Sequence, residues 1–166
     1  FTFTVKNVWQ YFTVQFNDDS TSPNRDAGSN YSTSTFKFTV PATGHYIISS
    51  VVKTSKTGDS DASIAGWLRV IRDNVEIMFS SNSFILFDPL TSTFTIPSQT
   101  IFLFSGQIIY MDFKVAWTTS INAPTMNVIK DNSYFEIKAI PDYFQSDTIT
   151  FSSAVPQKIK MSEFLL

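Results

Sequence analysis

Apolar and polar residues alternate along most of this chain, and this period of two is its strongest constraint on the fold. Residues 1–5, 12–16 and 36–40 each place Phe or Val at every second position, with Thr, Lys or Gln between them. Such alternation sets one face of a β-strand on a core and the other toward water. No helical period is present before about residue 155. The sequence therefore predicts an all-β sandwich or jelly roll, with roughly eight to ten short strands.

Turn-forming residues separate these runs. The segment 17–30 is rich in Asp, Asn, Ser, Gly and Pro and predicts a long loop. Pro-Ala-Thr-Gly at 41–44 predicts a tight corner, in which the proline ends one ladder and Gly44 permits a positive φ. Asp-Asn at 73–74 and Ser-Gly at 105–106 predict two hairpins.

The composition favours association with other chains. Charged residues make up only 16% of the chain, against about 25% in typical domains, and aromatic residues also make up 16%. The segment 101–104 reads Ile-Phe-Leu-Phe and is apolar on both faces of its strand, and the following strand begins with apolar residues on both faces. A neighbouring subunit would cover the second face, and the alternative is a loop or the C-terminal segment. The candidate oligomer interface consists of Phe102, Phe104, Ile108 and Tyr110.

Several kinds of chemistry are excluded by what the chain contains. There is no cysteine, which rules out disulfides, cysteine-based zinc sites and a thiol nucleophile. The net charge is −2 and no run of 18 apolar residues occurs, so we expect neither a nucleic-acid partner nor membrane insertion. The single histidine, His45, follows a turn glycine and has no predicted catalytic partner. We expect no enzymatic activity and no catalytic residues.

Two residue types leave a binding role open. Asp59 and Asp61 lie in one predicted loop and are the candidate calcium ligands, although we favour solvated loop carboxylates and no resident cofactor. Tryptophan side chains could stack on sugars. Packing in a core or interface is favoured for Trp67 and Trp117, whereas the role of Trp9 stays open.

The segment 36–52 carries a family resemblance and reads FKFTVPATGHYIISSVV. It resembles the signature of the complement component one-q globular-head family, a branch of the tumour-necrosis-factor-like jelly rolls. The matching residues are Phe38, Pro41, Gly44 and Tyr46. The resemblance spans roughly residues 12 to 140, and Gln107 departs from it by standing where the family has Asp. It implies a jelly roll of about ten antiparallel strands that forms a compact homotrimer, with binding at loops or subunit seams.

The chain changes character after residue 140. We predict a jelly-roll globular head over residues 1–140 and a short C-terminal extension over residues 141–166, either a linker or the start of a further element. A disordered tail is the other interpretation. Residues 156–165 are similar to a segment of large tail-associated phage proteins.

These features together predict a non-enzymatic trimeric module of a virion, in a phage tail, baseplate or fibre. Its partners would be other virion proteins and a host-surface glycan or protein. The alternative is a secreted or cell-surface ligand or adhesin of cellular origin, located outside the cell.

Overall fold

A computed structural model describes residues 1–16, 28–58, 61–80, 84–86, 91–118 and 122–141. These residues form strands and turns and contain no helix. The predicted C-terminal extension and most of the predicted loop at 17–30 lie outside them. The strands are β1 (Gln10–Thr13), β2 (Tyr31–Ser32), β3 (Lys37–Thr39), β4 (Gly44–Thr57), β5 (Ser63–Arg72), β6 (Val75–Phe79), β7 (Phe84–Leu86), β8 (Thr91–Leu103), β9 (Ile108–Thr118) and β10 (Thr125–Ala139).

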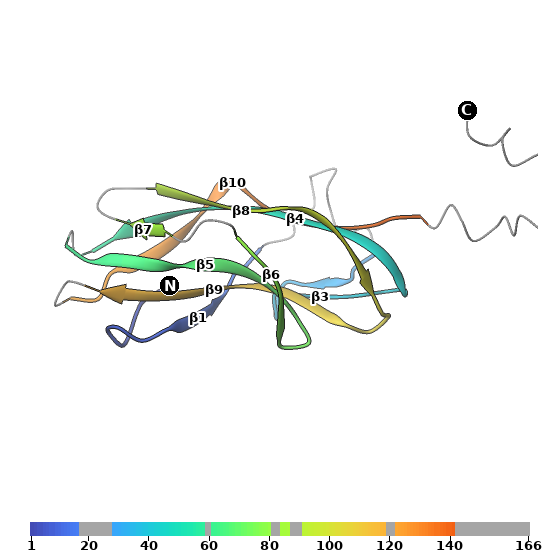
Figure 1. The fold of residues 1–166 in the computed structure, drawn as a ribbon, viewed down its shortest axis with the longest axis horizontal. Helices are drawn as coiled ribbons and strands as arrows, with labels where there is room; N and C mark the ends of the chain where they lie inside the picture. The colour runs from blue at the N-terminus through green and yellow to red at the C-terminus, as the bar shows by residue number, and fades with distance from the viewer. Residues whose placement is uncertain (17–27, 59–60, 81–83, 87–90, 119–121, 142–166) are drawn as a thin grey trace, which may run out of the picture.

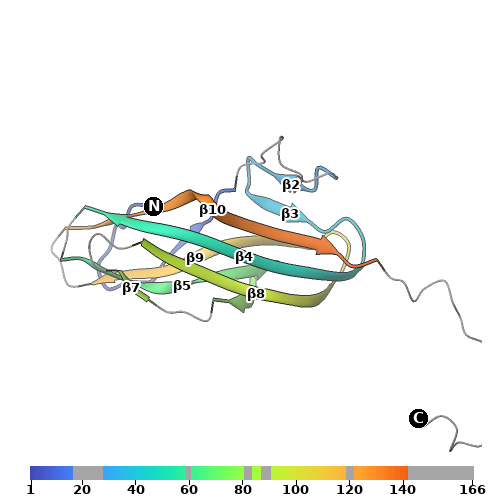
Figure 2. The same ribbon diagram turned by 90° about the horizontal axis from the view of Figure 1, so that it is seen from above.

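The strands form two antiparallel sheets that pack face to face (Figures 1 and 2). The large sheet has the order β2-β3-β9-β5-β6, with β1 also paired to β9 and β7 also paired to β5. The small sheet has the order β10-β4-β8. The prediction of an all-β sandwich with antiparallel strands is therefore confirmed.

The core lies between the sheets and follows the alternation in the sequence. On β4, Tyr46, Ile48 and Val52 are buried, whereas the residues between them are more exposed or polar. Phe94 of the small sheet meets Phe113 of the large sheet edge to face, with ring centroids 5.0 Å apart. Each fully buried aromatic or aliphatic side chain of this kind contributes about 1.5–3 kcal/mol through removal from water.

The N-terminal residues lie between β1 of the large sheet and β10 of the small sheet. Only one isolated bridge, between Thr2 and Thr125, forms there, so the alternation at residues 1–5 does not produce a full strand. Phe3 is nevertheless buried, and the rings of Phe1 and Phe12 stack 5.0 Å apart. Burial at every second position is thus retained at the start of the segment without a complete ladder.

Two corners carry the chain from one sheet to the other, and they lie against each other. The first joins β3 to β4 and the second joins β8 to β9. Val40 donates its N–H to the Gln107 carbonyl at 2.9 Å, and Gly106 donates its N–H to the Val40 carbonyl at 2.8 Å. Ser105 adds two contacts, from its N–H to the Thr43 hydroxyl and from its own hydroxyl to a backbone carbonyl of the first corner.

The prediction of a hairpin at residues 105–106 is wrong, because β8 and β9 belong to different sheets and do not pair. Gly106 does adopt a positive φ of 85°, but the turn hands the chain across the sandwich. The hairpin predicted at residues 73–74 is confirmed: β5 and β6 pair up to Arg72 and Val75. Asp73 and Asn74 have φ values of 49° and 69°, as this tight turn requires.

The signature residues lie at the first corner. Phe38 and Tyr46 are buried on either side of it, and the Tyr46 hydroxyl donates to the Ala42 carbonyl at 2.6 Å. Gly44 does not use the positive φ that a glycine permits, because the direction of the chain changes within residues 41–43 before β4 begins. Phe36 instead adopts a left-handed φ of 59° in the turn before β3, so it lies outside the strand predicted for 36–40.

A close backbone approach makes Gly66 of β5 irreplaceable. A Cβ there would collide with the Lys114 carbonyl oxygen and lie 2.8 Å from the Val115 Cα on the neighbouring strand. We expect Gly66→Ala to lower the free energy of unfolding by about 2–3 kcal/mol, since β5 and β9 must separate. Urea denaturation followed by tryptophan fluorescence measures the loss.

The matched control is Gly44→Ala. A Cβ at Gly44 meets no atom within 4 Å, and its φ suits any residue, so we expect a change within about 0.5 kcal/mol. Equal losses in the two variants would contradict the assignment of the cost to the β5–β9 approach.

Candidate functional site

The outer face of the large sheet carries an exposed group of aromatic and charged side chains. In the register of three adjacent strands, Trp67 of β5 lies opposite Lys114 of β9, which lies opposite Tyr11 of β1. In the next row, Arg69 lies opposite Asp112. These residues occupy the polar phase of their strands, so they face away from the core.

Trp9 and Trp67 form a pair around the Lys114 ammonium, which we name the tryptophan–lysine cluster. The two ring centroids are 5.1 Å apart with planes inclined by 54°. Lys114 Nζ lies 4.9 Å from the Trp67 centroid and 5.5 Å from the Trp9 centroid. Ala65 and Ala116 pair one step along the same face, and their short side chains leave room for the indole rings. Trp9 is 43% exposed.

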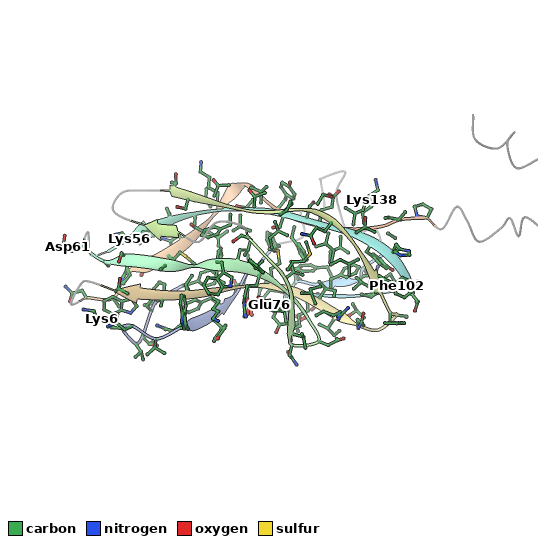
Figure 3. All side chains as sticks on the ribbon, in the orientation of Figure 1. Lys6, Lys56, Asp61, Glu76, Phe102 and Lys138 are labelled. Carbon is green, nitrogen blue, oxygen red and sulfur yellow. The ribbon has the colours of Figure 1, made fainter. Side chains whose placement is uncertain are left out.

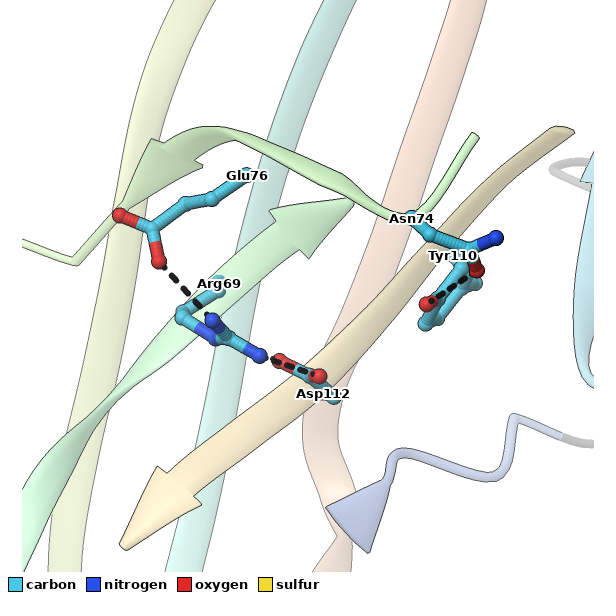
Figure 4. Close-up of polar contacts among 5 residues, drawn as sticks. All are labelled: Arg69, Asn74, Glu76, Tyr110 and Asp112. Carbon is cyan, nitrogen blue, oxygen red and sulfur yellow. Dashed lines mark hydrogen bonds and ion pairs between the residues drawn. The ribbon is translucent and has the colours of Figure 1, made fainter. Parts of the chain in front are cut away.

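Beside this cluster, an ion-pair network joins three strand positions (Figure 4). Arg69 binds Asp112 through two hydrogen bonds, from Nε to Oδ1 at 2.8 Å and from Nη2 to Oδ2 at 2.6 Å. Its Nη1 donates to Glu76 at 3.0 Å. The guanidinium also lies 4.9 Å from the Tyr11 ring centroid. The network therefore satisfies two carboxylates and fixes Arg69 under an aromatic ring.

Burial and charge shift the pKa values of this network. Burial raises the pKa of the Asp112 carboxyl above its ordinary value, although the hydrogen bonds and charge of Arg69 oppose the shift. For Arg69, burial by itself would lower the pKa of the guanidinium. The hydrogen bonds and charges of Asp112 and Glu76 outweigh that cause and raise the pKa, so Arg69 stays charged.

Tyr110 lies farther along the same face and is held by its neighbours. Its hydroxyl donates to Asn74 Oδ1 at 3.3 Å, and Lys37 Nζ lies 4.9 Å from its ring centroid. Burial raises the pKa of the Tyr110 hydroxyl, and the Asp112 charge adds to this shift. Ile108, just before it, is half-buried, and its N–H is bound by Asp73 Oδ1 at 2.8 Å.

The small sheet has its own exposed aromatic group at the end of β8. The Phe102 ring lies 5.0 Å from His45 and 5.3 Å from Phe104, in edge-to-face contacts. Phe102 is 44% exposed and Phe104 is 56% exposed. Since Tyr110 faces outward from the large sheet and Phe102 from the small one, the four residues of the candidate oligomer interface are divided between two faces.

The candidate metal ligands do not form a described site. Asp61 is exposed at the opposite end of the sandwich from Phe102 (Figure 3), and Asp59 lies outside the described residues. Within the ranges given above, no three His, Cys, Asp or Glu side chains cluster as metal ligands would.

The three tryptophans have different surroundings. Trp117 is buried in the core, as the sequence favoured, whereas Trp67 and Trp9 lie on the outer face of the large sheet. Sequence reasoning did not single out Lys114, Arg69 or Asp112. These three residues occupy the polar phase of β5 and β9, strands that are otherwise apolar, and Trp67 of β5 alternates with buried residues in the same way. That alternation was the sequence signal that could have found them.

No protein-family model matches the chain, and no curated protein matches it either. The part of the chain that the structure describes contains no helix that is long and apolar enough to cross a bilayer.

The ion-pair network makes stability depend on pH in a defined direction. Arg69→Met removes both causes that lower the pKa of Asp112 and leaves burial and the Glu76 charge, which raise it. A carboxyl with a raised folded-state pKa loses stability as pH rises from its unfolded pKa through its folded one. We expect the loss of unfolding free energy to be small near about pH 4 and to reach about 2 kcal/mol near pH 7. Urea denaturation at each pH measures it.

Two further variants test the cause. Asp112→Asn in the Arg69→Met background should flatten the pH dependence, because no carboxylate remains to be buried unpaired. Arg72→Met removes an arginine of the same strand that has no ion pair in the described part of the chain, and it should show little pH dependence. A pH-independent loss in Arg69→Met would contradict the assignment to Asp112.

Proposed function

We propose that this domain is a jelly-roll module without enzymatic activity that assembles as a homotrimer in a virion and contributes to attachment or assembly. The observation that carries the proposal is the outer face of the small sheet, which exposes the aromatic rings of Phe102 and Tyr134. The jelly-roll assignment, the assembly surface and the virion context each have separate support.

The order of the strands supports a jelly roll. Along the chain, β3 enters the large sheet, β4 the small one, β5 and β6 the large one, β8 the small one, β9 the large one and β10 the small one. This wrapping produces the sheet orders β3-β9-β5-β6 and β10-β4-β8, as expected when paired strands roll up around a core. In a jelly roll of this order, the first strand would lie beside β10. Phe1 lies at that position and exchanges backbone hydrogen bonds with Met126 of β10.

The assembly surface that we propose is the outer face of β10, β4 and β8. Val51 lies at its centre between Tyr134 of β10 and Thr95 of β8. Tyr134 is 49% exposed, and the Phe102 group lies at one end of the same face. Threonine dominates the outer phase of β8, whereas Lys53 of β4 and Glu136 and Lys138 of β10 bring charges to the rest of the face, so a neighbouring subunit would contact its uncharged β8 side most readily. Among the described residues, the edge of β8 pairs with no further strand and the edge of β10 pairs only with residues 1–2, so both edges could make further contacts.

The remaining parts of the proposal have support from the sequence. The similarity of residues 156–165 to tail-associated phage proteins favours a virion, with other virion proteins and a host-surface glycan or protein as partners. A trimer would present each binding surface three times, which strengthens attachment through weak individual sites. The surroundings of the parent gene separate this proposal from a secreted or cell-surface ligand: neighbouring tail genes favour the former and secretion genes the latter.

Sedimentation velocity tests the assembly. The wild-type chain should sediment as a species of three times the 18.7 kDa chain mass at micromolar concentration. Replacing two exposed rings, in the double variant Phe102→Ser/Tyr134→Ser, should shift the protein toward monomer, because the interface loses its apolar anchors.

The matched control is Phe79→Ser on the large sheet. Phe79 is 61% exposed, comparable to the replaced residues, but it lies outside the proposed surface, so the trimer should persist. A monodisperse wild-type monomer would overturn the assembly proposal, and equal dissociation in the control would overturn the choice of surface.

A further inference from the structure

We propose that the tryptophan–lysine cluster binds an acidic saccharide, that is, a sugar that bears a carboxylate. The exposed Trp9 indole would stack on the apolar face of the sugar ring, and Lys114 would receive the carboxylate. This inference rests on the proposed role as a binding module and names the ligand class. It uses the large sheet, not the assembly surface, so each can fail alone.

The rings offer a fixed platform for stacking. An indole face carries a negative quadrupole, which attracts the slightly positive C–H groups on the flat side of a pyranose. Trp9 is held against Trp67 at 5.1 Å, and strand β1, which begins at the next residue, is anchored to β9 by four consecutive residue pairs. Ligand binding would therefore require little ordering of these side chains.

Lys114 supplies the preference for a negative charge. Its ammonium contacts both indole rings and has no carboxylate partner among the described residues. The nearest carboxylate on its own face and strand is Asp112, and that group is already engaged by both prongs of the Arg69 guanidinium. A half-buried cation between aromatic rings can make a charge-assisted bond to an incoming carboxylate at the edge of a stacked sugar.

The charges around the cluster favour a ligand with few negative charges over a polyanion. Asp112 and Glu76 lie beside it, and Arg69 is occupied by them. Single-stranded nucleic acid also stacks on aromatic rings, but it needs a groove of unpaired cations along its backbone. Within the described part of the chain, Lys114 is the cation that contacts both indole rings, and the whole chain has a net charge of −2. A single carboxylate on a sugar fits this arrangement better.

A paired glycan panel tests the inference. The probes are immobilised oligosaccharides that contain uronic or sialic acids, each printed beside its counterpart with the carboxyl reduced to an alcohol. The wild-type protein should bind at least one acidic member and prefer it over its reduced counterpart by about tenfold. Titration of that oligosaccharide in solution, followed by tryptophan fluorescence, gives the affinity of a single site.

Variants separate charge from stacking. Lys114→Gln should weaken binding of the acidic sugar about tenfold and leave the reduced counterpart unchanged, because only the charge-assisted bond is lost. Trp9→Ala should weaken both, and Trp9→Phe should retain part of the affinity because it keeps a ring. The matched control is Lys37→Gln, which removes a cation over the Tyr110 ring on the same face and should leave binding unchanged.

Each variant is checked for folding by thermal unfolding. If Trp9→Ala loosens β1, Lys114→Gln and Trp9→Phe still decide the outcome. Absence of binding to any acidic glycan at millimolar concentration overturns the inference, as does equal loss in Lys37→Gln or tighter binding of a thymidine oligonucleotide. The Phe102→Ser/Tyr134→Ser variant should keep the solution affinity of each saccharide site and lose only avidity on the panel. Failure of the saccharide proposal can therefore be distinguished from failure of the assembly proposal.

Discussion

The two neighbouring corners hold the sandwich together, because each passes the chain from one sheet to the other. Val40 exchanges backbone hydrogen bonds with residues 106 and 107, so the β3–β4 and β8–β9 connections lie fixed against each other. Tyr46 closes the first corner through its hydroxyl, and Ser105 bridges the two. This arrangement satisfies the backbone where neither sheet can supply partners, and it sets the spacing in which the aromatic core packs.

With the sheets fixed in this way, the outer faces of the two sheets are the surfaces on which we propose binding. The two outer faces differ in chemistry. That of the small sheet is rich in threonine and exposed rings, which suits contact with another subunit. That of the large sheet combines indole rings with Lys114 and a satisfied ion-pair network, which suits a small polar ligand. In our proposals, assembly and ligand binding would therefore use opposite sides of one fold.

Much of the fold could be predicted from local pattern. The period of two identified the strands and the core positions, and Asp-Asn at 73–74 identified the β5–β6 hairpin. Ser-Gly at 105–106 was interpreted as a second hairpin, because a turn sequence specifies a reversal without specifying which sheet receives the next strand. The corner at 41–44 was predicted, but the freedom of Gly44 to take a positive φ is not used, since the chain bends within the three residues before it.

The sequence by itself determined the class of fold, the residues that face the core and the residues left outside, because alternation is a local property of a strand. The tertiary structure alone decided which outside residues share a surface. Phe104 and Ile108 are close in sequence but precede and follow a crossover between sheets, so the candidate interface is divided between two faces. Trp9, Trp67 and Lys114 are distant in sequence, yet strand pairing brings them together. Which strands distant in sequence become neighbours depends on long-range packing, which no short segment of sequence encodes.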